Sequence, residues 1–577
     1  MTQQKSAEER VATIRDGYAN DAPTLTLGAA VVDGTTYADA PVRLPLGMMN
    51  RHGLVAGATG TGKTITLQVM AEQLSDAGVP VFVSDIKGDL TGLITAGTAS
   101  EKLTARTQSV GMDWKPTAYP VEFFALGGDG KGVPIRASMT SFGPLLLSRV
   151  MDLNETQESS LQLIFHYADQ KGLLLDDLKD LRAVISFLTS DEGKPELKSL
   201  GGLSSATAGV ILRGLVNLEA QGLDQFFGLP EFDSAQLLRT APDGRGVISA
   251  LELPTLMQKP LLTSTFMMWL LADLFSELPE VGDADKPKLV FFLDEAHLLF
   301  NGASKAFLQQ IATTVRLIRS KGIGLFFVTQ NPTDVPTEVL GQLANRVQHA
   351  LRAFTPDDAK ALRATVSTYP TSDYDLEAAL TTLGTGEAII TVMNEKGAPS
   401  PVAWTKLWSP KSTMGASDAA AVDAAVAASS LLATYGTAAD RESAFERLQA
   451  TGGAGGAGSA PAAPSTGGAA APSGEPAASG SAPGGPLDLD AEARRIEEQI
   501  LGRPAAGAPS SQAPAPSPEE REEPPLTLPP TREPARRTSS GPTMGDQLGK
   551  AAVSVLTTLG NQIVRGMFGT SRRRRRR

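Results

Sequence analysis

Short apolar runs alternate with helical patterns at the start of the chain. Residues 52–57 predict a buried strand that enters a glycine loop, and apolar positions spaced three or four apart over residues 64–75 predict a helix after it. A second apolar run at 79–85 predicts another strand. Strand, loop, helix and strand in this order indicate the opening unit of a parallel sheet.

The middle of the chain changes to a purely helical pattern before the strands return. Residues 138–238 predict a helical insertion, because apolar residues recur at helical spacing. We therefore expect an α/β fold with a parallel central sheet, built from residues 51–137 and 239–410. The later strands are expected at 246–251, 289–293 and 324–329, with a final pair near 350 and 386–392, and a long apolar helix at 261–278.

The two ends of the chain differ from this core. Residues 1–50 form a short, glycine-containing lead-in, in which we expect a reduced β element. After about residue 412 the composition shifts sharply, and Ala, Gly, Pro and Ser come to dominate a segment that buries too little apolar surface to order itself. We expect a disordered linker over 411–543, then an amphipathic helix and a terminal run of six arginines within 544–577.

Composition excludes several kinds of site. The chain has no cysteine, which rules out disulfides and thiolate metal sites, and its four scattered histidines argue against a zinc centre. The net charge is -11 even with the arginine tail, so any contact with nucleic acid must be local rather than driven by the overall field. There is no signal-peptide pattern and no apolar run of about 18 residues, so we expect a cytoplasmic protein without a transmembrane segment.

The glycine loop has the spacing of a P-loop, Gly-x4-Gly-Lys-Thr. Its backbone N–H groups converge on phosphate oxygens, and the following helix adds the positive end of its dipole. We expect Lys63 to reach the β- and γ-phosphates of ATP and the Thr64 hydroxyl to bind Mg²⁺. The expected nucleotide-binding residues are Gly57, Ala58, Thr59, Gly60, Thr61, Gly62, Lys63 and Thr64.

A pair of carboxylates follows the predicted strand at 289–293. A carboxylate at the tip of a buried strand holds the magnesium shell, and its neighbour polarises the attacking water, so we assign Asp294 to the metal and Glu295 to the general base. Residues 294–297 also spell a label used for one helicase superfamily. Those proteins have two tandem motor cores, whereas this chain has room for one, so we interpret His297 as structural.

Three further features each allow two interpretations. Gln330, at the end of the next strand, either senses the γ-phosphate or serves as a helix cap or loop donor. Arg316, Arg319 and Lys321 either present an arginine to a neighbouring subunit's ATP or form a solvated basic face. The charged segment 85–89 is either a structural ion pair or part of the nucleotide pocket, since ligands gather at that edge of such a sheet.

Together these motifs resemble the HerA/FtsK branch of P-loop motors, and most closely its bacterial YjgR-type HerA-like ATPases. The matching segments are 57–64, 85–89, 289–297 and 319–332, and the resemblance covers about residues 20–410. It implies a RecA-like core and a homo-hexameric ring with ATP between subunits.

The same resemblance implies roles for individual residues. Lys63, Glu295 and Gln330 would act on ATP within one subunit, with Thr64 and Asp294 on magnesium. Arg319 occupies the place of an arginine that acts in trans, although Arg316 and Arg346 are near enough to compete.

The resemblance and the charge leave three functions to compare. The leading hypothesis is an ATP-driven hexameric DNA translocase or helicase. The second is a motor that acts on protein, as in secretion and conjugation ATPases with this core, which the acidic body favours. The third is a nucleotide-gated scaffold that recruits a protein partner through the C-terminal tail.

Overall fold

The computed structural model describes residues 5–85, 87–126, 130–199, 202–252, 259–282, 284–300 and 305–452. The amphipathic helix, the arginine run and the linker beyond residue 452 lie outside these ranges. Among the described helices, none combines the length and the apolar character needed to cross a membrane.

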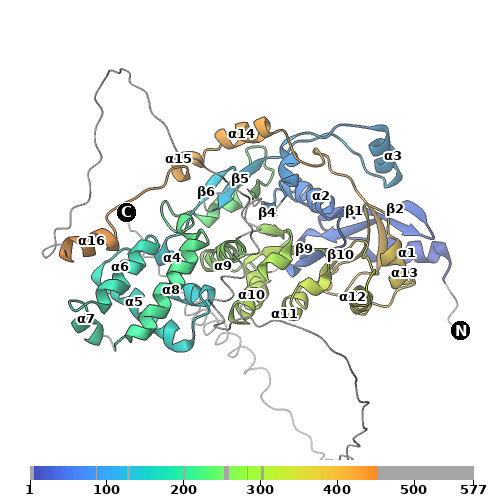
Figure 1. Ribbon diagram of the computed structural model, residues 1–577. Helices are drawn as coiled ribbons and strands as arrows, with labels where there is room; N and C mark the ends of the chain where they lie inside the picture. The colour runs from blue at the N-terminus through green and yellow to red at the C-terminus, as the bar shows by residue number, and fades with distance from the viewer. Residues whose placement is uncertain are drawn as a thin grey trace, which may run out of the picture. The chain divides into compact units, whose positions relative to one another are not determined.

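A sheet of 12 strands runs through the centre of the described part of the chain (Figure 1). Its order is β2-β1-β12-β11-β10-β3-β9-β8-β4-β7-β5-β6. Strands from β10 to β6 are parallel, while the pairs from β2 to β10 are antiparallel. The expected α/β fold with a parallel central sheet is therefore confirmed.

The strand bounds agree closely with the apolar runs of the sequence, because the central strands are buried on both faces. The parallel strands are β3 (Gly53–Ala56), β4 (Val81–Asp85), β5 (Val121–Leu126), β6 (Val133–Ile135), β7 (Ile248–Glu252), β8 (Leu289–Leu293), β9 (Ile323–Thr329) and β10 (Asn345–Gln348). The remaining strands are β1 (Thr24–Val32), β2 (Thr35–Pro45), β11 (Glu387–Thr391) and β12 (Ala403–Leu407).

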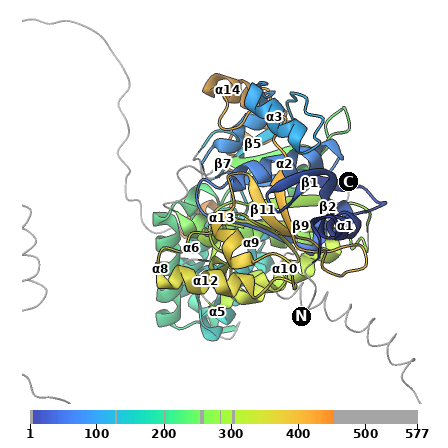
Figure 2. The same ribbon diagram turned by 90° about the vertical axis from the view of Figure 1, so that its right-hand side faces the viewer.

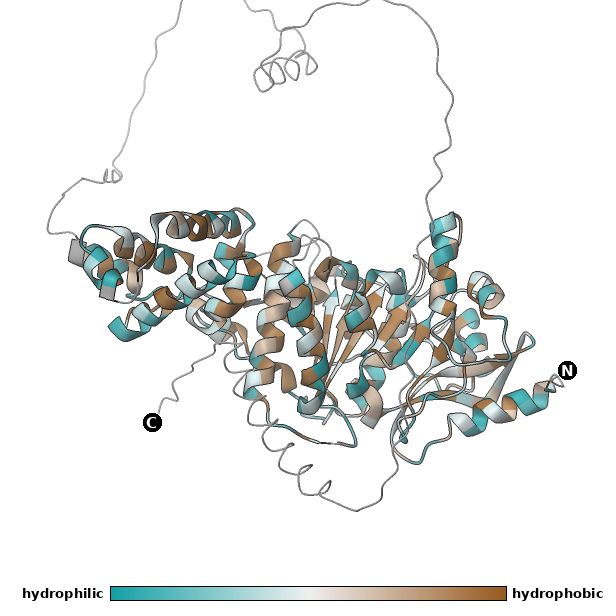
Figure 3. Ribbon diagram, turned by 90° about the horizontal axis from the view of Figure 1, so that it is seen from below, coloured by the Kyte–Doolittle hydropathy of each residue, from teal (hydrophilic) through white to brown (hydrophobic). Residues whose placement is uncertain are grey.

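Two apolar layers cover the sheet, one on each face. Successive residues of β3 point to opposite sides, so Leu54 and Ala56 join one cluster and Val55 joins the other. Figure 2 shows α2 and α14 on one side of the strands and α5, α6, α8 and α10 on the other. In Figure 3 the central strands are largely brown, or hydrophobic, and brown stretches also mark the helices around them.

Helices before and around the parallel strands complete these layers. Those outside the helical insertion are α1 (Ala7–Gly17), α2 (Lys63–Asp76), α3 (Glu101–Ser109), α9 (Pro260–Glu277), α10 (Lys305–Ile318), α11 (Thr337–Leu340), α12 (Pro356–Val366) and α13 (Leu376–Thr382). The lead-in expected at 1–50 contributes α1 and the β1–β2 pair, which extends the central sheet through β12.

Between β6 and β7 the chain forms a group of helices, where a helical insertion was expected. It comprises α4 (Met139–Val150), α5 (Glu155–Lys171), α6 (Leu178–Thr189), α7 (Lys194–Ser199) and α8 (Ser205–Ala220). Helix α5 begins with a capping box, in which Asn154 and Gln157 each satisfy the other's backbone N–H. We refer to α4–α8 as the helical module.

The first part of the segment expected as a disordered linker, residues 411–543, contains helices in the structure. Residues 411–452 contain α14 (Ala419–Ala427), α15 (Leu432–Tyr435) and α16 (Ala444–Gly452). We refer to residues 408–452 as the return segment, because it leaves β12 and ends beside the helical module. Its buried positions include Ser412, Ser443 and Ala444, so polar contacts order a stretch that apolar periodicity does not reveal.

The first part of the return segment is hydrogen-bonded to α2. Glu72 is 2% exposed, and its carboxylate accepts from the backbone N–H groups of Lys411 and Ser412 at 2.8 and 3.0 Å. Gln68 is also buried, and its amide donates to the Thr413 carbonyl at 2.8 Å. These contacts join the return segment to the helix that follows the glycine loop.

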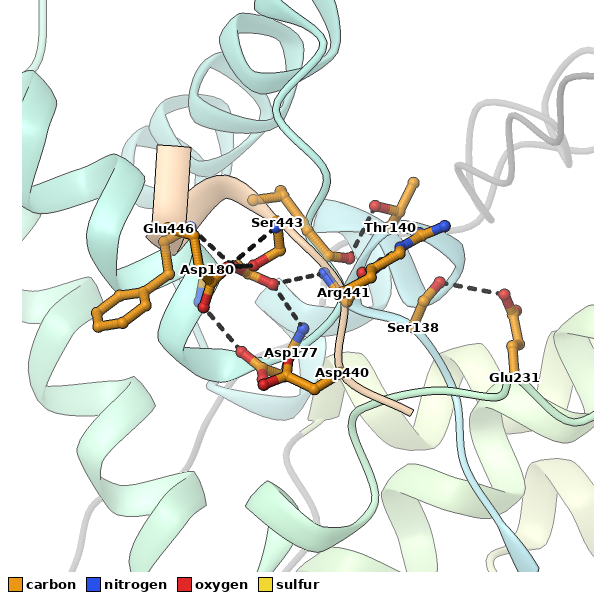
Figure 4. A network of polar contacts seen from close by, with 12 residues as sticks. Ser138, Thr140, Asp177, Asp180, Glu231, Asp440, Arg441, Ser443 and Glu446 are labelled. Carbon is orange, nitrogen blue, oxygen red and sulfur yellow. Dashed lines mark hydrogen bonds and ion pairs between the residues drawn. The ribbon is translucent and has the colours of Figure 1, made fainter. Parts of the chain in front are cut away.

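The last part of the return segment is bound to the helical module by a polar network (Figure 4). The Arg441 guanidinium donates two 2.7 Å hydrogen bonds to the carboxylate of Asp176. The fully buried Asp180 carboxylate accepts from the Ser443 hydroxyl and from the N–H of Phe445. Charge-assisted bonds of this kind are about twice as strong as neutral ones, and they fix α16 on α6.

Candidate functional site

The glycine loop lies at the carboxyl end of β3, between the ends of β9 and β10. Gly62 has a left-handed φ of 109° at the cap of α2, a conformation that favours glycine. A Cβ on Gly57 would lie 2.4 Å from the Cβ of His349, so glycine is required there by close packing. The loop geometry therefore explains the glycine pattern found in the sequence.

Neighbouring strands hold the loop in place through its backbone. The Gly57 N–H donates to the Thr329 carbonyl at 3.2 Å, and the Ala58 N–H donates to the Ala350 carbonyl at 2.8 Å. The N–H of Gly386 donates to the carbonyl of Thr61 at 3.0 Å. The loop is thus tied to β9, β10 and the start of β11.

Lys63 begins α2 and is 7% exposed. Its Nζ donates to the carbonyl oxygens of Gly57 and Ala58, at 2.7 and 3.3 Å, so the side chain curls back over the loop. Burial lowers its pKa, an effect that the carboxylates of Glu295 and Asp294 oppose. Thr64 follows it in the first turn of the helix.

The two predicted carboxylates lie directly after β8, as expected. Asp294 is 6% exposed, its N–H donates to the Ser84 hydroxyl at 3.0 Å, and its Oδ1 accepts from the Glu295 N–H at 2.9 Å. Burial raises the pKa of Asp294 to about 6, with a further contribution from the charge of Glu295. Asp294 is therefore a carboxylate that a cation would stabilise in its ionised form.

Glu295 adopts a left-handed backbone conformation with φ of 46°, which is uncommon outside glycine. Its Oε1 pairs with Lys87 Nζ at 2.8 Å, and its Oε2 lies 3.4 Å from His297 Nδ1. Burial acts to raise the pKa of Glu295, but the bond from Lys87 and the cations around it bring that pKa below its usual range. Glu295 is consequently ionised at neutral pH.

The charged segment after β4 forms a structural ion pair, the first of the two interpretations that the sequence left open, through Lys87 and Glu295. The Asp85 carboxylate accepts from the N–H groups of Lys87, Gly88 and Leu90 and so shapes the turn. Burial raises the pKa of Asp85 to about 6. Lys87 leaves the same turn and reaches Glu295, a contact that the sequence did not identify.

Gln330 follows β9 and borders a pocket of about 550 Å³ beside the tip of the glycine loop. The Thr59 hydroxyl lies 3.5 Å from its Oε1. His297 also lines this pocket, so the structure places it at the site rather than in the core. The lining residues are Ala58, Thr59, His297, Gln330, Asn331, Asp334, Leu351, Arg352 and Asp358.

A second pocket of about 350 Å³ adjoins the end of the loop at Gly62 and the first turn of α2. Apolar side chains, including Ile65, Leu103 and Trp408, form much of its lining. Arg106 closes one side, and its guanidinium donates to the Gly386 carbonyl at 2.7 Å. The two pockets therefore adjoin different parts of the loop, one at Ala58 and Thr59 and the other at Gly62.

The structure does not bring Arg319 to the glycine loop of its own chain. Arg319 lies in a 3-10 turn (Arg319–Lys321) that precedes β9, whereas the loop follows the opposite ends of β3 and β9. Its charge acts on the buried His52 at the start of β3. Arg346 lies within β10, where it donates to the Thr368 hydroxyl, and Arg316 lies in the last turn of α10.

The donors at the loop suit magnesium better than a softer metal. Asp294 offers a carboxylate and Thr64 a hydroxyl, and Mg²⁺ typically takes one or two such oxygens together with phosphate oxygens. Among the described residues, no group of three or more His, Asp or Glu side chains could hold a metal without help. The residues present therefore fit a magnesium ion that arrives with a phosphate ligand.

Comparison with known proteins identifies the family to which the chain belongs. The model of the family described as "Helicase HerA-like C-terminal" matches residues 31–483, which is most of the chain. The chain belongs to this HerA-like family. The glycine loop, the Asp294-Glu295 pair and Gln330 all fall within the matched region, and no curated protein sequence matches the chain.

Solved structures that match the chain include those of TrwB and VirB4. The bacterial conjugative coupling protein TrwB, in an unbound form, is 16% identical with a TM-score of 0.46, and the match covers 70% of this chain and 95% of that one. TrwB in complex with ADP and Mg²⁺ matches at 16% identity and a TM-score of 0.45, covering 68% and 98% of the two chains. VirB4 of Thermoanaerobacter pseudethanolicus is 15% identical with a TM-score of 0.43, covering 67% and 97%.

Proposed function

We propose that this HerA-like protein is a magnesium-dependent ATPase whose hydrolytic site is formed by the glycine loop, Asp294 and Glu295. One observation carries the proposal. A glycine loop ending in a buried lysine lies close enough to two carboxylates at the tip of β8 for their charges to act on that lysine. A phosphate-binding loop beside paired carboxylates is the arrangement that phosphoryl transfer to water requires.

The two pockets indicate how ATP would lie. The apolar pocket at Ile65 and Trp408 suits a nucleobase, and it adjoins Gly62 and Thr66 at the start of α2. The polar pocket at Thr59 and Gln330 adjoins an earlier part of the loop, at Ala58 and Thr59. Phosphates cradled by the loop would then extend from the first pocket toward the second.

Lys63 and Glu295 would change partners when ATP binds. The Nζ of Lys63 would exchange the carbonyls of Gly57 and Ala58 for phosphate oxygens, which carry full negative charge. Glu295, ionised and oriented by Lys87, would accept a hydrogen bond from the attacking water and align it with the terminal phosphate. Gln330 would bind the same water or the terminal phosphate from the end of β9.

Asp294 and Thr64 would hold the magnesium ion. When bound, this ion supplies positive charge that neutralises the phosphate oxygens during transfer. Removing magnesium with a chelator should therefore abolish turnover.

We further propose that the ATPase works as a homo-hexameric ring that moves along DNA, with Arg319 acting on the ATP of a neighbouring copy. Membership of a family described as helicases supports the DNA substrate. The position of Arg319, away from the glycine loop of its own chain, is compatible with action on a neighbour.

Variants of the site test the ATPase proposal. Lys63→Ala should lower ATP affinity and reduce turnover by roughly 100-fold or more, because it removes the cation of the loop. Glu295→Gln should keep ATP binding and lower turnover by roughly 100- to 10,000-fold, the range for loss of a general base. Lys360→Ala, an exposed lysine on α12, is the control and should match the wild type. Full activity in Lys63→Ala would refute the site.

A second measurement tests the ring and its substrate. ATP turnover is measured without DNA, with single-stranded DNA and with double-stranded DNA, alongside the mass of the assembly. We expect stimulation by one form of DNA and a mass of six chains. Turnover that DNA leaves unchanged would count against the DNA motor and favour a motor that acts on protein.

A further inference from the structure

The segment after β10 lies against the glycine loop. Strand β10 runs parallel to β3, with Gln348 opposite Ala56, so the two chains leave the sheet at the same edge. The Ala350 carbonyl accepts from the Ala58 N–H at 2.8 Å, one peptide before the loop reaches Thr59. The residues that follow β10 therefore lie beside the tip of the glycine loop.

Two anchors fix the backbone on either side of Arg352. On one side Leu351 is 6% exposed, and its N–H donates to the Leu380 carbonyl of α13 at 2.9 Å. On the other side the Asp358 carboxylate accepts from the N–H groups of Phe354 and Thr355, at 3.1 and 2.9 Å. Arg352 itself is exposed, so an anchored backbone presents its guanidinium to solvent.

The Arg352 guanidinium extends over the loop. Its Nη2 lies 3.5 Å from the Thr59 carbonyl oxygen, and the residue lines the same pocket as Thr59 and Gln330. A guanidinium has five N–H donors, so this single long contact leaves most of them available. The two lysines nearest the site are already engaged, Lys63 with the loop carbonyls and Lys87 with Glu295.

We propose that Arg352 binds the terminal phosphate of the nucleoside triphosphate held by the glycine loop of its own chain. The proposal rests on the ATPase function proposed above and adds a residue that distinguishes tri- from diphosphate. The pocket of Arg352 adjoins the loop at Ala58 and Thr59, whereas the apolar pocket adjoins it at Gly62, so a nucleotide with its base in the apolar pocket would extend its last phosphate toward Arg352. A planar guanidinium matches phosphate oxygens in two-point contacts, which an ammonium group does not.

Arg352 and Arg319 thus occupy different places relative to one loop. Arg352 lies at the carboxyl edge of the sheet beside Thr59, whereas Arg319 precedes β9 at the amino edge. Arg352 can therefore bind the phosphate without a second copy of the chain. Its contribution to nucleotide binding can be measured as a change in the dissociation constant.

The experiment compares two ligands in the full chain. Dissociation constants are measured with Mg²⁺ for a non-hydrolysable ATP analogue and for ADP. Arg352→Gln should weaken binding of the ATP analogue by roughly 10- to 100-fold, which is the loss expected when a hydrogen bond to a charged group is removed. It should change ADP affinity less than about twofold, because ADP lacks the phosphate in question. Arg352→Lys should recover part of the loss, since it restores the charge without the planar fork.

Matched controls separate the possible outcomes. Arg363→Gln removes an exposed arginine from α12, outside the pocket, and should leave both affinities unchanged. Equal losses for both ligands in Arg352→Gln, or no loss for either, would overturn the proposal for Arg352 alone. Nucleotide binding that Lys63→Ala leaves intact would instead overturn the ATPase function on which it rests. A melting temperature equal to that of the wild type shows that the variants are folded.

Discussion

Contacts within the protein fix the orientation of the side chains at the glycine loop. Lys63 is paired with loop carbonyls and Glu295 with Lys87; Lys63 and Glu295 are buried, whereas the Lys87 side chain is 45% exposed. In such a setting a fixed charge acts more strongly than it does at the surface. The orientation of Glu295 therefore depends on Lys87 as well as on its own left-handed backbone.

Replacing Lys87 should change how the reaction depends on pH. In Lys87→Met the main influence that lowers the pKa of Glu295 is lost, so burial, now opposed only by the charges of His297 and Lys63, raises that pKa. Glu295 must be ionised to orient water, and the acidic limb of the profile of kcat against pH should therefore move to higher pH. The measurement is kcat between pH 5 and 8, together with ATP affinity.

Lys360→Met provides the matched control for this profile, because Lys360 is an exposed lysine on α12. It should leave the acidic limb where the wild type has it. If the acidic limb of the profile of kcat against pH lies at the same pH in Lys87→Met as in the wild type, Lys87 does not set the pKa of Glu295.

At the scale of elements, the sequence predicts best where local pattern and burial agree. Strand β8 has the predicted bounds, because five consecutive apolar residues are buried on both faces. The glycine loop can be predicted equally well from the sequence, because steric constraints require glycine in it. At Gly57, for example, a larger residue would clash with His349. The positions of Lys63, Asp294 and Glu295 follow from these two elements.

Other parts of the site depend on contacts that no local pattern records. Arg352 reaches the loop only because β10 pairs with β3, strands almost 300 residues apart in the chain. The contact from Lys87 to Glu295 likewise requires β4 beside β8. The return segment was missed because its few large buried side chains, Val422, Leu431 and Tyr435, are widely spaced among alanine and serine, which are also typical of linkers.

The joint between α16 and α6 gives a prediction at this scale. Arg441→Ala leaves the Asp176 carboxylate, which is 11% exposed, without its bidentate partner. We expect a loss of about 1 to 2 kcal/mol in the docking of α16, since the arginine itself is half exposed. Hydrogen exchange over residues 438–450 should become faster, while exchange in the central strands stays unchanged.

Arg182→Ala is the control for this measurement. Arg182 forms an exposed ion pair with Glu219 inside the helical module, away from the return segment. It should leave exchange over residues 438–450 as in the wild type. If hydrogen exchange over residues 438–450 is as slow in Arg441→Ala as in the wild type, the ion pair between Arg441 and Asp176 does not hold α16 in place.

At the scale of the whole molecule, the return segment connects the two ends of the described structure. It passes along α2, contacts β5 through α14 and reaches α6 through α16 (Figure 1). The helix after the glycine loop and the helical module are therefore joined through a third stretch of chain as well as through the sheet.

Shortening the chain tests this connection. A chain that ends after residue 410 removes the donors to Glu72, leaving a buried carboxylate whose pKa burial raises further. We expect it to lose roughly 3 kcal/mol or more of stability at neutral pH, because unsatisfied buried groups cost about 1–3 kcal/mol each. A chain that ends after residue 452 keeps these contacts and should melt at a clearly higher temperature. Equal melting temperatures would contradict the role given to the return segment.

The docking of α16 also has a mechanical consequence. Anything that pulls on the chain at residue 452 transmits its load first to α6, through the Arg441–Asp176 and Ser443–Asp180 contacts acting in parallel. The strands around the glycine loop would feel that load only after this joint gave way. The helical module is thus the part of the molecule that tension from the C-terminal side would displace first.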